Sequence, residues 1–209
     1  MSVIPRLATS LGQKDEIPNQ LLATEIALSS DSAAIQELVE NLTNKDGNIA
    51  SDCLKTLYEI GYIKPQLIAD YTDAFLNLIF SRNNRLVWGS MIALGVIAPL
   101  VPQKLFAARE RIINAMRQGS VITIDNGVKV LARVAAASPE YERELFPFLI
   151  DHLTHCRTKE VPQHAESILV CVKHENKRNF EDVLTKRMVD MTPSQSARVH
   201  KLLKETGTL

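Results

Sequence analysis

Three prolines, Pro65, Pro102 and Pro139, follow one another at a constant interval of 37 residues. Apolar side chains keep the same interval in the segments that follow these prolines. A repeat of this length is typical of folds in which one structural unit is stacked on the next, so it constrains the whole chain. The matched apolar sets are Phe75, Ile112 and Leu149; Leu76, Ile113 and Ile150; and Ile79, Met116 and Leu153.

The segments between these blocks repeat as well. Cys53, Ser90 and Gly127 bring a small side chain to one position, and a leucine follows four residues later. On a helix these two positions lie one turn apart on one face, where a small residue permits close approach of a neighbouring helix. The prolines fall in the first turn of the helix that follows them, where the missing N–H costs nothing. Each unit is therefore predicted to be a helical hairpin.

The stretch "NNRLVWGSMIALGVIA" combines a polar turn, an aliphatic residue, a small residue four positions on, and Leu-Gly a further turn on. This pattern resembles the HEAT and armadillo-like repeats, over roughly residues 20–190. The resemblance implies an all-α fold, a right-handed α-α superhelix of about four to five helical hairpins. The sequence departs from the family at Ala50, Val87 and Ile124, which replace the usual arginine, and its fourth unit drifts in register.

The ends of the chain suggest three segments. We predict an N-terminal arm or short helix at residues 1–16, HEAT-like repeats at 17–191 and a C-terminal capping helix at 192–209. Thr192 supplies an N-cap to the last helix, and Pro193 its first helical position. The dipeptide Asn126-Gly127 ordinarily favours a hairpin turn. The repeat keeps a helical register through it, however, and predicts a helix there.

Composition excludes some classes of protein. The 209 residues are 45% apolar and 23% charged with no net charge, as in an ordinary folded domain. The charge-free run from Leu86 to Gln103 contains two prolines and is too short to cross a bilayer as one helix, so no membrane contact is expected. Three cysteines without paired spacing, and a beginning without a secretory signal, predict reduced thiols and a cytoplasmic location.

The resemblance also implies a binding surface, because in such repeats the second helix of each hairpin lines the concave face used for ligands. There Trp88 can anchor a peptide or stack on a base, although packing between repeats is the alternative. Lys129 and Arg133, four residues apart, can together hold a phosphate or carboxylate. The predicted groove residues are Asp52, Lys55, Glu59, Trp88, Ile92, Asp125, Lys129 and Arg133.

Histidines and cysteines gather in "HLTHC" and "CVKH", together with a histidine between them. His152 and Cys156 share a helical face, which makes a zinc site conceivable. No established ligand spacing is matched, so we predict no metal and no cofactor, interhelical packing for Cys171 and surface positions for most of the histidines. The residues concerned are His152, His155, Cys156, His164, Cys171 and His174.

No catalytic constellation is visible, and we predict a non-enzymatic scaffold that binds a protein or peptide partner. The alternative is a nucleic-acid-binding protein related to the HEAT-like alkyl-base DNA glycosylases. The segment from Arg82 to Arg133 supports the nucleic-acid alternative, because it contains eight basic residues and only two acidic ones. Residues 1–60, by contrast, hold nine acids and four bases. That family's pocket needs more than one tryptophan and a nearby carboxylate; here Trp88 is alone and Ile92 stands one turn on.

Overall fold

The computed structural model describes residues 2–207, and across them it contains helices and turns but no β-strand. The chain divides into two compact units, residues 1–126 and 127–209. The division falls within helix α8 (Val121–Ala137). The all-helical fold predicted from the repeat is confirmed.

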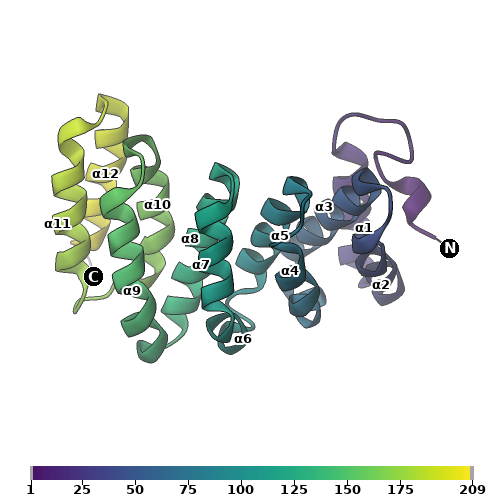
Figure 1. The fold of residues 1–209 in the computed structure, drawn as a ribbon, viewed down its shortest axis with the longest axis horizontal. Helices are drawn as coiled ribbons and strands as arrows, with labels where there is room; N and C mark the ends of the chain where they lie inside the picture. The colour runs from purple at the N-terminus through teal and green to yellow at the C-terminus, as the bar shows by residue number, and fades with distance from the viewer. Residues whose placement is uncertain (1, 208–209) are drawn as a thin grey trace. The chain divides into compact units, whose positions relative to one another are not determined.

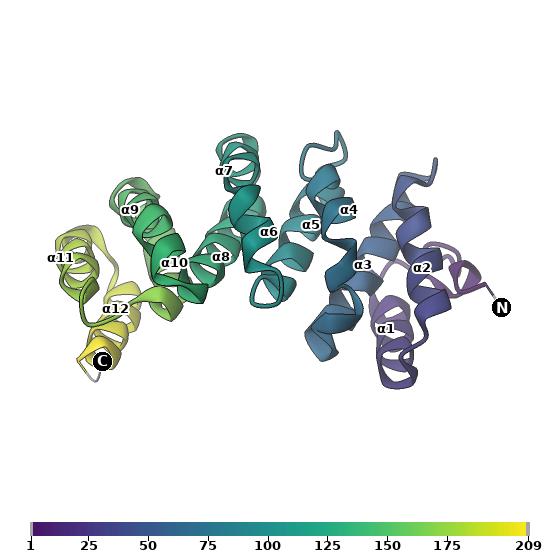
Figure 2. The ribbon, with the colours of Figure 1, turned by 90° about the horizontal axis from the view of Figure 1, so that it is seen from below.

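The first unit is a stack of helices in which α3 packs between α1 and α5 (Figure 1). A shorter helix completes each hairpin, because α2 packs on α3 and α4 packs on α5 (Figure 2). The helices are α1 (Ile17–Ser29), α2 (Ser32–Glu40), α3 (Gly47–Ile63), α4 (Thr72–Leu78), α5 (Asn84–Ile97), α6 (Pro102–Ala107), α7 (Arg109–Gln118) and the first residues of α8.

The second unit repeats this arrangement. Here α9 packs against α10 and α11, and α12 packs against α10 and α11. Its helices are the remainder of α8, then α9 (Pro139–His155), α10 (Val161–Ile168), α11 (Lys177–Arg187) and α12 (Pro193–Thr206).

The period of the sequence reappears in the positions where helices begin. Helices α3, α5 and α8 begin at residues 47, 84 and 121, so successive starts are 37 residues apart. Polar caps fix the first two of these starts: the Asp46 side chain accepts a hydrogen bond from the Asn48 N–H, and the Asn83 side chain accepts one from the Arg85 N–H. The interval lengthens at α10, which begins at residue 161, and this is the predicted drift of the fourth unit.

The repeated apolar positions form the core. Leu57, Leu94 and Leu131 are fully buried, as are Cys53 and Ser90 at the small position one turn before. Close approach of α3 and α5 is visible at Gly89, where a Cβ atom would lie 2.8 Å from Cδ2 of Leu54. Gly89, one residue before the repeated small position, therefore lets α3 and α5 approach closely.

The first helix of the hairpin is interrupted in two repeats. After Pro65 the chain forms two 3-10 turns, Pro65–Leu67 and Ala69–Tyr71, before α4 begins. After Pro102, α6 is short, and Ala108 separates it from α7. Only Pro139 opens a continuous helix, α9. The proline starts a helical turn each time, but in two repeats the turn does not propagate.

The two ends of the chain are packed more firmly than their composition suggests. Before α1, a 3-10 turn at Ile4–Arg6 is flanked by Val3 and Leu7, which are both buried. At the other end, Thr192 and Gln195 form a reciprocal capping box at the start of α12, which confirms the predicted N-cap. None of the described helices is long and apolar enough to cross a membrane.

Candidate partner-binding surface

A stripe of three side chains emerges from the otherwise buried helix α5. Between Leu86 and Ile97, Trp88, Ile92 and Val96 are partly exposed, and every other residue is buried. Steps of four residues place these three side chains on one face of the helix. Trp88 therefore lies at the edge of the core, with part of its ring open to solvent.

The repeat places other side chains at the equivalent positions of α3 and α8. Shifted by 37 residues, the positions of Trp88, Ile92 and Val96 become Ser51, Lys55 and Glu59 on α3 and Asp125, Lys129 and Arg133 on α8. All of these except Ser51 are at least partly exposed. The equivalent positions are thus polar and charged on α3, apolar on α5 and charged on α8.

Asp52 differs from the other predicted groove residues. It lies one residue beyond the stripe position of Ser51, and one residue turns a side chain by about 100° around a helix. Asp52 is only 6% exposed, and its carboxylate accepts a hydrogen bond of 2.7 Å from the Thr9 N–H. The expectation that Asp52 faces a groove is corrected, because the N-terminal segment occupies its carboxylate.

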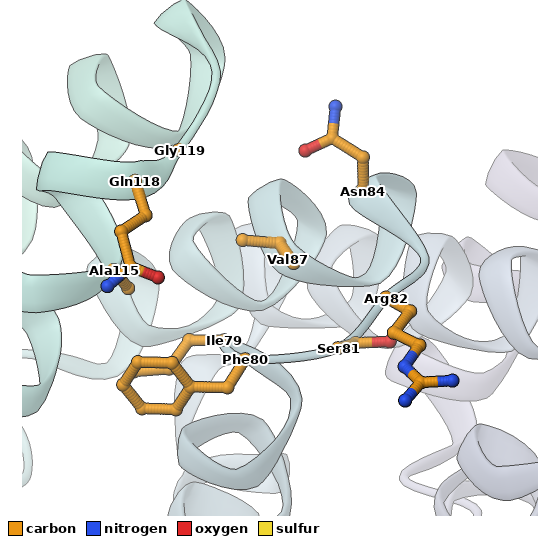
Figure 3. Close-up of a pocket in the computed structure, with 9 residues that line it drawn as sticks. All are labelled: Ile79, Phe80, Ser81, Arg82, Asn84, Val87, Ala115, Gln118 and Gly119. Atoms are coloured by element: carbon orange, nitrogen blue, oxygen red, sulfur yellow. The ribbon is translucent and has the colours of Figure 1, made fainter.

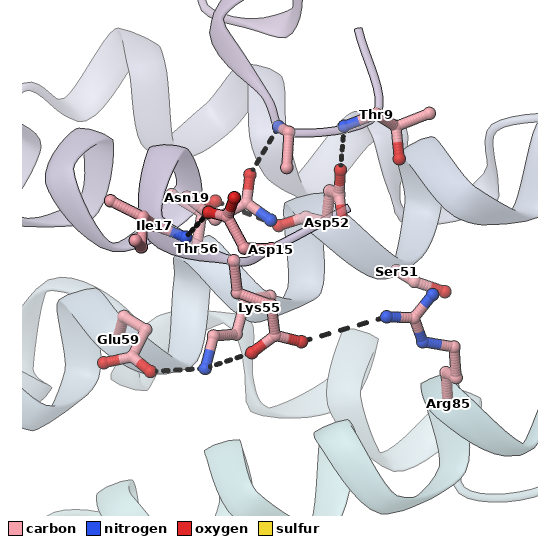
Figure 4. A network of polar contacts seen from close by, with 12 residues as sticks. Thr9, Asp15, Ile17, Asn19, Ser51, Asp52, Lys55, Thr56, Glu59 and Arg85 are labelled. Carbon is pink, nitrogen blue, oxygen red and sulfur yellow. Dashed lines mark hydrogen bonds and ion pairs between the residues drawn. The ribbon is translucent and has the colours of Figure 1, made fainter. Parts of the chain in front are cut away.

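Lys55 and Glu59 lie on the stripe, and they are engaged within the chain. The Lys55 Nζ is 2.9 Å from a carboxylate oxygen of Glu16 and 2.7 Å from one of Glu59 (Figure 4). The Lys55 side chain is 12% exposed, and its Nζ lies over the Tyr58 ring, 4.9 Å from the ring centre. Burial works against the charge of Lys55, but hydrogen bonds to Glu59 and Glu16 outweigh it and raise the pKa of the ammonium.

The segment before α1 therefore covers part of α3. Glu16 also approaches Arg85 of α5, at 3.8 Å, and the Ala8 N–H donates to the buried Asn19 side chain at 2.9 Å (Figure 4). The repeat pattern gave no sign of this cover, because the segment lies outside the repeats. On α3 the stripe residues Lys55 and Glu59 are thus occupied by ion pairs, whereas the stripe residues of α5 are apolar side chains.

In the second unit the two predicted anion-binding residues line one groove. Lys129 and Arg133 of α8 face a hollow of about 510 Å³. The far side of this groove carries an ion pair, in which Arg198 donates to both carboxylate oxygens of Glu166, at 2.9 and 2.7 Å. The groove is completed by Gln163, Ser167 and Val170. Three bases and one acid leave it with a surplus of positive charge.

A smaller hollow of about 210 Å³ in the first unit was not predicted. Figure 3 shows Phe80 and Val87 on one side of it and Gln118 with Ala115 on the other. Phe80 is 49% exposed. The sequence does contain a signal for this exposed ring: the residue equivalent to Phe80 one repeat later is Arg117, and a position that holds a charged residue in another copy is expected at the surface. Its other lining residues are Ile79, Ser81, Arg82, Asn84 and Gly119.

The histidines separate into two groups. His155 and His174 are exposed, as expected, and Cys171 is packed in the interior. His152 is partly buried and His164 is fully buried, so His164 is the one of these four histidines that lies in the interior. Its Nδ1 lies 3.0 Å from Nε2 of His152, so two imidazoles meet inside the second unit.

Comparisons with known proteins bear on the fold. No family model matches the sequence, and no curated protein matches it. Solved structures do match: a designed armadillo repeat protein in complex with a (KR)4 peptide is 16% identical, with a TM-score of 0.70 over 97% of this chain and 99% of that one. A computationally designed armadillo repeat protein for modular peptide recognition is also 16% identical, with a TM-score of 0.67 over 97% of each chain.

At these identities the likeness is one of fold, and it agrees with the repeat, with the helix starts 37 residues apart and with the buried positions of each hairpin. The chain is an α-helical repeat protein with the armadillo/HEAT-like solenoid fold.

Proposed function

We propose that this chain is a non-enzymatic repeat scaffold that binds a protein or peptide partner on the second helices of its hairpins. We call these the inner helices: α3 and α5 in the first unit, and α10 and most of α8 in the second. The observation that carries the proposal is the stripe on α5. Trp88, Ile92 and Val96 are the only residues between Leu86 and Ile97 that are not buried, and all three are apolar. A partly exposed tryptophan beside aliphatic side chains is the composition of a binding hot spot.

The chemistry of the partner follows from each surface separately. In the first unit Lys55 is already neutralised by Glu16 and Glu59, so the α5 stripe selects an apolar side chain. In the second unit Lys129 and Arg133 face a groove with surplus positive charge, which selects a carboxylate or another anionic group. Neither surface, taken by itself, favours a basic peptide.

Two of the similar structures support peptide binding as the mode. One holds a (KR)4 peptide and the other was designed for modular peptide recognition. The basic groove of this chain would repel a (KR)4 peptide, so we propose a different specificity on the same fold. We also propose a cytoplasmic location, which is supported by three cysteines that form no disulfide.

The test is affinity capture of partners from the native cell with wild-type protein and with a variant carrying Trp88→Ala, Lys129→Glu and Arg133→Glu. We expect the variant to lose the specific partners. A matched control carries Val189→Ala, Lys45→Glu and Lys186→Glu, three exposed positions outside the inner helices, and should keep the partners. Equal recovery by both variants would show that the inner helices are not the binding surface.

Nucleic-acid binding is tested with the same proteins. Fluorescence anisotropy of a labelled duplex at low and moderate salt separates the two functions, because phosphate contacts weaken steeply with salt. Submicromolar, salt-sensitive binding that the triple variant loses would contradict the peptide scaffold and favour the nucleic-acid alternative. Absence of binding removes that alternative.

A further inference from the structure

Two imidazoles and a thiol meet where α9 ends and α10 begins. Nε2 of His152 is 3.0 Å from Nδ1 of His164, and these nitrogens and the Sγ of Cys156 all lie within 4.8 Å of one another. His164 is fully buried, and His152 and Cys156 are partly buried. Imidazole nitrogen and cysteine sulfur are the ligands that Zn²⁺ takes in proteins.

The local fold explains how three residues from two helices come together. His152 and Cys156 lie one turn apart, and Cys156 is the C-cap residue directly after α9. The chain then turns through a 3-10 segment, Thr158–Glu160, and α10 brings His164 back against α9. The ligand atoms therefore face one another across a single helical turn-around.

Arg187 of α11 holds this turn-around in place from outside. Its guanidinium donates to the carbonyl oxygens of Leu153 at 3.2 Å and Cys156 at 2.7 Å, and also to that of Thr154. These bonds involve backbone atoms and none of the three ligand atoms, so they position the backbone with or without a bound ion. Because these contacts already fix the backbone, less conformational entropy is lost when a metal binds.

A tetrahedral site can form here after side-chain movements. With Zn–N near 2.0–2.1 Å and Zn–S near 2.3 Å, ligand atoms of such a site are separated by roughly 3.3–3.7 Å. The two nitrogens, at 3.0 Å, need to part by a few tenths of an ångström. The Cys156 sulfur, which lies within 4.8 Å of them, needs to approach by up to about 1 Å to reach that separation.

We propose that His152, Cys156 and His164 form a Zn²⁺ site, with the fourth position open to water. Without the ion, the hydrogen bond between the two imidazoles satisfies His164 in the interior. The site lies in the second unit and does not depend on the partner-binding surface proposed above.

The test is titration of the metal-stripped full chain with Co²⁺, followed by its optical spectrum. We expect one ion per chain, with the intense visible bands of tetrahedral cobalt and a thiolate-to-cobalt band in the near ultraviolet, and we expect Zn²⁺ to displace the cobalt. Cys156→Ser should abolish the thiolate band. His164→Gln should lower the affinity by at least about tenfold, because even outer-shell partners of a metal contribute that much.

Controls keep the result interpretable. His155→Ala removes an exposed histidine from the same turn of α9 and should leave cobalt binding unchanged. His152→Gln repeats the test at a partly exposed position if His164→Gln fails to fold, as judged by circular dichroism. The proposal is overturned if the wild type binds no stoichiometric cobalt, or if its spectrum and affinity persist in Cys156→Ser and His152→Gln.

Discussion

Leu7→Ala measures how firmly the N-terminal segment is built into the first unit. Leu7 is fully buried, and Val3 and Ala8 are buried on either side of it. Replacing a buried leucine by alanine removes its transfer free energy and leaves a cavity, at a cost of about 2–5 kcal/mol. The segment lies near a chain end and can partly collapse into the space. We therefore expect a loss of about 2–3 kcal/mol in the free energy of unfolding.

Urea denaturation followed by the fluorescence of Trp88 is the assay, since this single tryptophan lies in the first unit. Leu11→Ala is the matched control: Leu11 is in the same segment but 52% exposed, and its loss should change stability by less than about 0.5 kcal/mol. If Leu7→Ala is as stable as Leu11→Ala, with an unchanged denaturant slope, the segment is not part of the folded unit and the burial of Asp52 loses its explanation.

Three further predictions concern single polar groups. Asp52→Asn weakens the charge-assisted hydrogen bond from the Thr9 N–H and should lower stability by about 1 kcal/mol; an unchanged urea midpoint would mean that the bond is not formed in solution. Ser90→Ala removes a buried hydroxyl that has no hydrogen-bond partner among the described residues, so the variant should be as stable as the wild type or more stable by about 1 kcal/mol. A clear loss of stability in Ser90→Ala would reveal a partner for the hydroxyl. Burial raises the pKa values of the Cys53 and Cys171 thiols to about 12 from an ordinary value of 9.0, so the protonated thiols favour the folded state. This contribution is complete below about pH 9 and is lost as pH rises toward 12, so stability should fall over that window, and less so in Cys53→Ala than in the wild type. Equal pH dependence in both proteins would contradict it.

Much of the fold could be predicted because its pattern is local and periodic. The 37-residue interval between Pro65, Pro102 and Pro139 is also the interval between the starts of α3, α5 and α8, at residues 47, 84 and 121. A helical period places small and leucine residues on one face without knowledge of any distant contact. The same reasoning places Trp88 and Ile92 on one exposed face of α5, and the structure has both partly exposed.

The remaining features depend on contacts that no periodicity reports. The Asp52 carboxylate accepts a hydrogen bond from the N–H of Thr9, which lies 43 residues earlier and outside the repeats. Lys55 forms an ion pair with Glu16 of the same N-terminal segment. His164 belongs to the fourth repeat of the sequence, whose register drifts. The repeat pattern therefore could not predict which way the His164 side chain faces. In each case a neighbour from outside the regular pattern decides the environment of the residue.

The comparison between copies of the repeat bears on what Trp88 does. Positions that the core needs keep their character: Leu57, Leu94 and Leu131 are leucine in all three copies and fully buried. The position of Trp88 does not, since it holds Ser51 in the preceding copy and Asp125 in the next. The surroundings of this position also differ, because Ser51 is buried whereas Trp88 and Asp125 are partly exposed. The repeat itself therefore does not require an aromatic ring at this position, and the partly exposed Trp88 beside Ile92 and Val96 is the feature on which the proposed contact with a partner rests.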